Sequence, residues 1–201
     1  MPTSLRLSRD FFAQPTVDVA RSLLGMRLVR LEGGMRLAGI ITEAEAYRGE
    51  EDQGCHAKAG LTARTRVMYG LPGHTYVYFT YGMHWMLNIV TESQGFPAAV
   101  LLRAILPTEG LEVIAARRNG RPWAQWTDGP AKLCQALGID GRQHGLDLCA
   151  PGAEIFVESG ETVPDSTVTI GPRVGLNNVP EPWKSMPWRF RVSSAMFSGV
   201  T

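Results

Sequence analysis

The chain has 201 residues, of which 44% are hydrophobic and 19% are charged, and its formal net charge is +1 at pH 7. These values predict one globular domain spanning residues 1–201, and they exclude a disordered or fibrous chain. Because the chain is nearly neutral overall, any contact with nucleic acid must depend on local basic clusters, which are also typical of an ordinary solvated surface. The candidate clusters are Lys58, Arg64 and Arg66; Arg117, Arg118 and Arg121; and Lys184, Arg189 and Arg191.

The N-terminal half is predicted to contain one helix, one long strand and a hairpin. The helix covers roughly Thr16–Leu24, with its apolar residues on one face and Gly25 at its end. Alternating side chains predict a strand over Leu37–Tyr47. Strands over Thr75–Thr80 and His84–Thr91 are predicted to form a hairpin, because Gly82 between them permits a tight turn.

The C-terminal half is predicted to begin with a strand over Ala98–Leu106. A helix from near Thr108 to Gly120 and a helix from Pro130 to Gly138 follow, because proline is favoured in a first turn and glycine after a last one. The remaining predicted strands are Ala153–Glu158, Ser166–Ile170 and Trp188–Val192. The expected fold class is α+β, with a curved, largely antiparallel sheet, surrounding helices and a protruding β-hairpin.

No secretion signal or membrane span is predicted. Residues 1–12 contain no apolar core of a signal peptide, and the longest apolar stretch is interrupted by Arg103. Three cysteines without C-x-x-C spacing indicate neither a disulfide framework nor a zinc ribbon. We therefore expect a cytoplasmic protein with reduced, mostly buried thiols at Cys55, Cys134 and Cys149.

Two carboxylates share one face of the strand over Leu37–Tyr47. Alternation places Ile41, Glu43, Glu45 and Tyr47 together, which is unusual for a strand that is otherwise half-buried. Two interpretations have equal weight for this segment alone. The glutamates either lie at a solvated edge or pair with arginines, or one of them is functional.

Aromatic side chains strengthen the functional interpretation. His56 follows this strand, Tyr76 and Tyr78 share one face of the hairpin, and Tyr81 lies at its tip. Each of these residues alone is more typical of a core, but together they predict an aromatic pocket beside a carboxylate. The aromatic rings of such a pocket can stack on an electron-poor or cationic ring, and each stacked base contributes about 1–3 kcal/mol of binding energy. A tyrosine at a hairpin tip fills the gap left when a nucleotide leaves its stack.

Six segments in order match a known family. They are ARSLLG (20–25), TEAEAY (42–47), YVYFTYGM (76–83), LLRA (101–104), GPAKLCQAL (129–137) and RVG (173–175). On these segments, which span most of the chain, it resembles the alkyladenine (3-methyladenine) DNA glycosylases of the mammalian methylpurine type. The resemblance implies a base-excision-repair enzyme that flips alkylated or deaminated purines out of duplex DNA and hydrolyses the N-glycosidic bond. The implied substrates are of the 3-methyladenine, hypoxanthine and ethenoadenine class.

The resemblance also implies catalytic roles. Glu45 matches the general base that deprotonates the attacking water, and Arg103 and the backbone carbonyl near Val174 help to hold that water. The carboxylate also stabilises the positive charge of an oxocarbenium-like sugar. Because no lysine stands at the matched catalytic or pocket positions, we expect a monofunctional enzyme that leaves an abasic site without cutting the strand.

The remaining implied roles concern DNA. The residues matched to the pocket walls are Tyr47, His56 and Tyr78, with Asn88 as a steric gate against the exocyclic amine of guanine. His56 also hydrogen-bonds the base edge or the sugar-phosphate. The residues matched to the DNA surface are Tyr81 as the intercalating wedge, Met83 as its support, His84 where mammalian members carry a minor-groove tyrosine, and Lys132 as a phosphate contact at a helix N-terminus. The segment Ser193–Met196 also departs from the mammalian pattern.

Other functions remain open at this stage. Glu43 and Glu45, about 6.5–7 Å apart along a strand, also fit a carbohydrate hydrolase with paired carboxylates. A noncatalytic module that binds lesions or single strands would use the same aromatics without needing Glu45. Metal chemistry is the weakest alternative, because no ligand spacing links His56, His74, His84 and His144. We expect no metal or cofactor, a monomer, and damaged double-stranded DNA as the partner.

Overall fold

The computed structural model describes residues 5–199. Its strands are β1 (Arg27–Glu32), β2 (Met35–Arg48), β3 (Thr75–Thr80), β4 (His84–Val90), β5 (Ala98–Glu109), β6 (Ile155–Glu158), β7 (Val168–Gly171) and β8 (Arg189–Val192). Its α-helices are α1 (Arg9–Phe12), α2 (Thr16–Ser22), α3 (Leu111–Arg117) and α4 (Pro130–Leu137). Its 3-10 helices are η1 (His56–Ala59), η2 (Arg66–Tyr69), η3 (Trp123–Gln125), η4 (Gly141–Gln143), η5 (Asp165–Thr167) and η6 (Ser194–Phe197).

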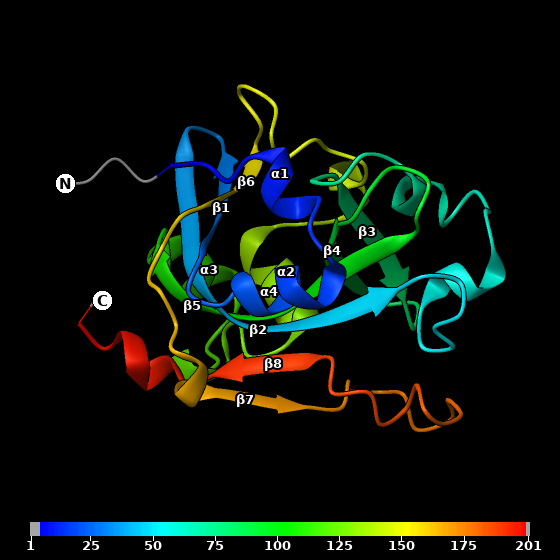
Figure 1. Cartoon of the computed structure of the whole chain (residues 1–201). Helices are drawn as coiled ribbons and strands as arrows, with labels where there is room; N and C mark the ends of the chain where they lie inside the picture. Colours follow the sequence, from blue (N-terminus) through cyan, green and yellow to red (C-terminus); the bar gives the residue numbers. More distant parts are fainter. Residues whose placement is uncertain (1–4, 200–201) are drawn as a thin grey trace.

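The strands form one eight-stranded antiparallel sheet in the order β3-β4-β5-β2-β1-β6. A hairpin of β7 and β8 joins the sheet through pairing of β8 with β2. Figure 1 shows β2 crossing the middle of the molecule, with α2 against it and the β7–β8 hairpin below it. The α+β class and the antiparallel sheet that the sequence predicts are confirmed.

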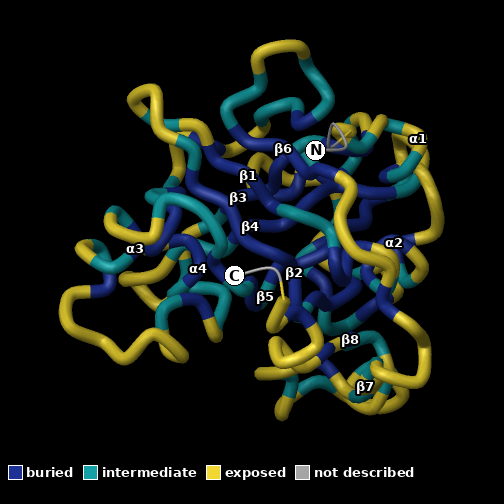
Figure 2. Tube along the Cα trace, turned by 90° about the vertical axis from the view of Figure 1, so that its left-hand side faces the viewer, coloured by how far each residue is buried: buried dark blue, intermediate teal, exposed yellow. Residues whose placement is uncertain are grey.

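One main hydrophobic core lies between the sheet and the helices. It includes Val19 of α2, Leu133 of α4 and Leu28 of β1, all of which have almost no exposed surface. Figure 2 shows the buried chain concentrated at the centre of the molecule and the exposed chain in the peripheral loops. A second buried cluster, which includes Cys55, Met68 and Tyr76, lies between β3, β5 and the segment that follows β2. This second cluster supports the cavity described below.

Register shifts interrupt the pairing of β2 with β5. Ile41 pairs with Ile105 and Glu43 with Ala104, so Thr42 is an extra residue in β2. A bulge of this kind reverses the alternation of side chains. The prediction that Ile41 shares a face with Glu43 and Glu45 is therefore wrong, and Ile41 lies in the main core.

The helix predicted from Thr108 begins at Leu111 instead. Thr108 lies in β5, which continues to pair with β2 as far as Glu109. Gly110, with a φ of 70°, then turns the chain into α3, a conformation that glycine adopts at little cost. The helix predicted from Pro130 is confirmed as α4, and Gly138 ends it with a φ of 64°.

The three cysteines form no disulfide; Cys55 and Cys134 are buried and Cys149 is half-buried. Between residues 5 and 199, no helix combines the length and the apolar character needed to cross a membrane.

The core placement of Leu28 predicts a specific loss of stability. Leu28→Ala should lower the free energy of unfolding by about 2–5 kcal/mol, because it removes buried methyl groups and leaves a cavity. Chemical denaturation measures this change. Leu61→Ala, at a position that is 63% exposed, is the matched control and should stay within about 0.5 kcal/mol of wild type. A loss for Leu28→Ala as small as that of the control would contradict the described core.

Candidate active site

A cavity of about 360 Å³ opens where the β3–β4 hairpin, β5 and two loops meet. Its lining comes from η1, from the hairpin, from β5 and from the loop at residues 174–176. The lining includes all four residues predicted as a base pocket, Tyr47, His56, Tyr78 and Asn88, together with Arg103 and Tyr81. The structure thus brings together side chains from segments that lie far apart in the sequence.

A second irregularity of the sheet directs Arg103 toward the carboxylates of β2. Glu43 pairs with Ala104 and Ala44 pairs with Leu102, so Arg103 is an extra residue in β5. Bulges re-aim side chains, and here the Arg103 guanidinium reaches both glutamates. Its Nε donates to Glu43 Oε1 at 2.7 Å and its Nη1 donates to Glu45 Oε2 at 3.3 Å.

The Glu45 carboxylate lies directly behind the cavity lining, with none of its side chain exposed. Besides Arg103, the Tyr47 hydroxyl donates to Oε2 at 2.8 Å and the backbone N–H of Val174 donates to Oε1 at 2.8 Å. The predicted contact of a backbone carbonyl near Val174 with the attacking water stays a prediction, and what the structure adds is the hydrogen bond from the Val174 N–H to Glu45. All three donors belong to residues that line the cavity.

Burial and hydrogen bonding shift the pKa of Glu45 in opposite directions. Loss of hydration disfavours the charged form and raises the pKa of Glu45 above its ordinary value, and the neighbouring Glu43 adds to this. The charge of Arg103 and the hydrogen bonds from Val174 and Tyr47 lower the pKa again, without cancelling the effect of burial. A buried carboxylate with a perturbed pKa beside a cavity is typical of a functional site rather than of a simple surface acid.

Glu43 has a different environment from Glu45. It is held by two arginines, Arg103 at 2.7 Å and Arg189 at 3.1 Å, and it is absent from the cavity lining. Of the two interpretations that the sequence left open, pairing with arginines describes Glu43. The two carboxylates therefore do not flank the cavity as an equivalent pair.

The hydrogen bonds of His56 define its protonation. Burial and the nearby positive charges of Arg64 and Lys58 lower the pKa of His56 to about 4, so the ring is neutral at pH 7. A guanidinium only donates, so the Arg64 Nη2 at 3.3 Å makes Nε2 of His56 the acceptor. The proton is then on Nδ1, which donates to the Tyr76 hydroxyl at 2.8 Å. The Tyr76 hydroxyl keeps its own hydrogen for another acceptor.

Tyr78 completes one aromatic wall. Its ring meets the His56 ring edge-on at a centroid distance of 4.6 Å, and the Arg64 guanidinium lies 5.1 Å from its centre. Burial raises the pKa of Tyr78 to about 12, which keeps it protonated at physiological pH. Asn88 is buried beside this wall, and its Nδ2 donates to the Tyr76 carbonyl at 2.9 Å, which fixes the amide.

The hairpin tip projects from this wall. The Tyr81 side chain is 82% exposed and Met83 is 66% exposed. Tyr81 has a φ of 52° and Gly82 a φ of 67°, and Met83 N–H donates to the Thr80 carbonyl at 3.2 Å, as in a type I′ turn. Asn or Gly suits the first of these positions better than a tyrosine, so the backbone at Tyr81 is strained. Strain of this kind is concentrated at functional sites.

The remaining predicted contacts lie outside the cavity. Lys132 forms an ion pair with Asp128 at 2.8 Å, and Pro130, rather than Lys132, lines the cavity. His84 is exposed at the start of β4. Their predicted contacts with DNA remain predictions. Among the described residues, no group of three or more His, Cys, Asp or Glu side chains is placed to hold a metal ion.

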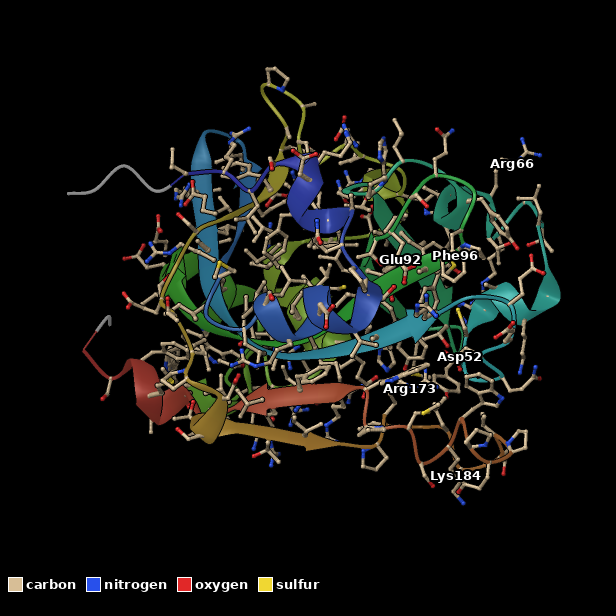
Figure 3. All side chains as sticks on the ribbon, in the orientation of Figure 1. Asp52, Arg66, Glu92, Phe96, Arg173 and Lys184 are labelled. Atoms are coloured by element: carbon tan, nitrogen blue, oxygen red, sulfur yellow. The ribbon has the colours of Figure 1, made fainter. Side chains whose placement is uncertain are left out.

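Sequence reasoning missed two buried residues beside the site, Asp52 and Arg173, whose ion pair joins loops 121 residues apart in the chain. The available signal was Arg173 in the matched segment RVG, immediately before Val174. Figure 3 shows Arg173 close to Asp52, between the end of β2 and the loop that precedes β8.

Comparison with known proteins identifies the family that this chain matches. The family model described as methylpurine-DNA glycosylase matches residues 10–196. Three curated relatives carry the name "Putative 3-methyladenine DNA glycosylase". The relative from Methanocella arvoryzae is 48% identical over 92% of this chain and 90% of its own length. The relative from Chlorobaculum parvum is 42% identical over 98% of this chain and 91% of its own length. The relative from Myxococcus xanthus is 45% identical over 92% of this chain and 89% of its own length.

The environment of His56 predicts a measurable shift. Arg64→Gln removes a positive charge that disfavours the imidazolium, so the pKa of His56 should rise from about 4 toward its ordinary value, while burial keeps it below that value. An NMR titration of the histidine rings measures this. Arg66→Gln is the matched control, because Arg66 extends away from the site (Figure 3) and does not contribute to the shift. An unchanged His56 pKa in Arg64→Gln would overturn the assigned tautomer and contact.

Proposed function

Because the chain belongs to the methylpurine-DNA glycosylase family, we propose that it flips alkylated or deaminated purines out of duplex DNA and releases them by hydrolysis with a water activated by Glu45. It is a DNA N-glycosylase of base excision repair, a hydrolase of N-glycosyl bonds. The observation that carries the proposal is the position of the Glu45 carboxylate, hydrogen-bonded from three residues that form the lining of an aromatic cavity.

The acceptor capacity of Glu45 supports its role as the base. A carboxylate accepts about four hydrogen bonds. Arg103, Tyr47 and Val174 supply three, so one further donor, the attacking water, completes the set. Because Glu45 has no exposed surface in the free protein, the bound nucleotide has to shift the lining side chains to admit that water. Catalytic contacts commonly tighten only in the substrate complex.

The chemistry of the bond explains why one carboxylate suffices. Cleavage passes through an oxocarbenium-like sugar cation, which a nearby carboxylate stabilises as it takes a proton from water. Methylation at N3 or N7 makes the base cationic and a good leaving group. A neutral lesion such as hypoxanthine needs protonation or a hydrogen bond to leave, and we propose as one donor the hydroxyl of Tyr76, a lining residue that accepts from His56 and so keeps its own hydrogen.

The pocket supplies selectivity by stacking and by exclusion. Tyr47 forms one part of the cavity wall, and the joined rings of His56 and Tyr78 form another. A cationic or electron-poor purine gains more from tyrosine faces than a normal purine does. The fixed amide of Asn88 excludes guanine, because the exocyclic amine of guanine would collide with it.

The tip of the hairpin acts as the wedge. Tyr81 and Met83 project into solvent from the turn that follows the strand carrying Tyr78, so a tip inserted between base pairs brings the pocket to the everted base. The duplex is the partner, and Lys132 and His84 contact its backbone. We propose that the protein acts as a monomer in the cytoplasm, at the nucleoid in a bacterial cell.

The role of Glu45 predicts the outcome of a matched pair of variants. Glu45→Gln should lower single-turnover base release from duplexes carrying 1,N6-ethenoadenine or hypoxanthine by about 10²–10⁴-fold, because an amide cannot accept a proton from water. Binding to the same duplexes should persist. Alkali cleavage of the resulting abasic site provides the measurement, without added metal.

Glu43→Gln is the control from the same strand face. This variant leaves Glu45 intact and removes only a charged partner of Arg103 and Arg189. The rate of base release should therefore fall by about tenfold or less. Equal losses for the two variants would favour a paired-carboxylate mechanism. Wild-type cleavage by Glu45→Gln would reject Glu45 as the base.

The wedge predicts a selective defect. Tyr81→Ala should reduce excision of a paired lesion by about tenfold or more, since one aromatic stack is worth about 1–3 kcal/mol, while binding to undamaged duplex changes much less. Phe79→Ala, which removes another exposed aromatic from the same hairpin, is the control and should leave excision near wild type. Equal losses of excision and undamaged-DNA binding would make Tyr81 an ordinary surface contact.

A further inference from the structure

Arg173 and Asp52 form a completely enclosed ion pair next to the site. Neither side chain has any exposed surface. Nη1 of Arg173 donates to Asp52 Oδ2 at 2.5 Å and Nη2 donates to Oδ1 at 2.8 Å, so the contact is bidentate. This geometry fixes the plane of the guanidinium as well as its position.

The same guanidinium contacts two further segments, the end of β2 and the segment before β8. It donates to the carbonyl of Ala46 at 3.0 Å and to the carbonyl of Trp183 at 3.1 Å. Its Cζ lies 4.7 Å from the centre of the Tyr47 ring and 5.0 Å from that of Trp188. One side chain thereby joins the end of β2, the loop after β7 and the segment before β8.

Asp52 organises the turn that leads to His56. Its side chain accepts from the N–H groups of Arg48 and Gly54, and its carbonyl accepts from Cys55 N–H. Gly54 packs so closely that a Cβ there would lie 2.7 Å from Cδ1 of Leu176, 2.9 Å from Nη2 of Arg173 and 3.2 Å from Oδ1 of Asp52. The pair therefore controls the approach of the chain to the aromatic wall.

Such a pair is a poor device for stability alone. Removing two charges from water costs several kcal/mol per ion, and apolar residues of similar volume are often equally stable in their place. An apolar replacement cannot supply the directed contacts that Arg173 makes with three other segments: the turn at Asp52, the end of β2 and the segment before β8. The position of the pair then matters: Arg173 directly precedes Val174, whose N–H is bonded to Glu45, and it stacks on Tyr47, whose hydroxyl is bonded to Glu45.

We propose that Arg173 and Asp52 are positioning residues of the glycosylase reaction, which hold the Val174 N–H and the Tyr47 ring against the Glu45 carboxylate. The inference rests on the proposed function of Glu45 as the base. Neither residue touches the substrate in this account; both act through Val174, Tyr47 and the turn before His56.

The test uses variants of the pair in the full-length protein. Asp52→Asn removes the charge with little change of shape, and Arg173→Lys keeps the charge but not the bidentate contact. Gly54→Ala keeps both partners and crowds them together with Leu176 of the cavity lining. The matched controls are Arg36→Lys and Glu158→Gln, which alter another bidentate arginine–carboxylate pair, between β2 and β6.

Two readouts separate positioning from stability. The first is the maximal single-turnover rate of hypoxanthine release at saturating enzyme, measured at a temperature where each variant is folded. The second is the pKa of the Glu45 carboxyl in the DNA-free protein, followed by side-chain NMR. Glu43, Tyr47, Arg103 and Arg189, the other ionisable groups around Glu45, stay unchanged in every variant.

The expected result is a rate loss of about tenfold or more in the pair variants, with little change in lesion binding. The pKa of Glu45 should rise in them, because the Val174 and Tyr47 hydrogen bonds that lower it are weakened. The controls should change neither quantity. Wild-type rates and an unmoved Glu45 pKa in Arg173→Lys and Gly54→Ala would overturn the proposal, even if Asp52→Asn fails to fold. If wild type releases no base, the proposed function fails, and the NMR titration still decides whether the pair positions Glu45.

Discussion

A buried carboxylate that stays close to a cavity is the constraint on which this structure depends. Burial raises the pKa of Glu45, and three donors, from β2, β5 and the loop after β7, lower it again. Each donor also lines the cavity. The groups that stabilise the charge are therefore the same groups that a nucleotide would meet on entering.

The sheet makes this convergence possible. Its bulges at Thr42 and Arg103 break the regular pairing of β2 with β5, which turns Arg103 onto the carboxylate face while Ile41 stays in the core. The hairpin of β3 and β4 adds a wall of aromatic rings and extends it to an exposed, strained tip at Tyr81. The wall and the tip share one short element, so the proposed insertion of the tip into DNA would also bring the pocket toward the duplex.

Local patterns predicted much of the frame and part of the site. Alternation placed Glu43 and Glu45 together correctly, because it depends only on the pleat of a strand, and Pro130 and Gly138 marked α4 for equally local reasons. Three features depend on long-range pairing, which no local pattern encodes. They are the bulge at Thr42, the continuation of β5 through Thr108 and the enclosed ion pair of Asp52 with Arg173. The role of Arg103 came from family resemblance alone, and the pairing of Glu43 with two arginines became evident only in the fold.

In the proposed mechanism, Glu45 must be ionised for the N-glycosidic bond to break. The most direct measurement is the pH dependence of single-turnover release of a cationic N3-methylated adenine by the wild-type enzyme, because this leaving group needs no proton and the profile reports the base alone. The rate should rise with pH to a plateau, with a midpoint above the ordinary glutamic acid value of 4.5, since burial raises the pKa of Glu45. A rate that is constant or falling across that range would contradict the account.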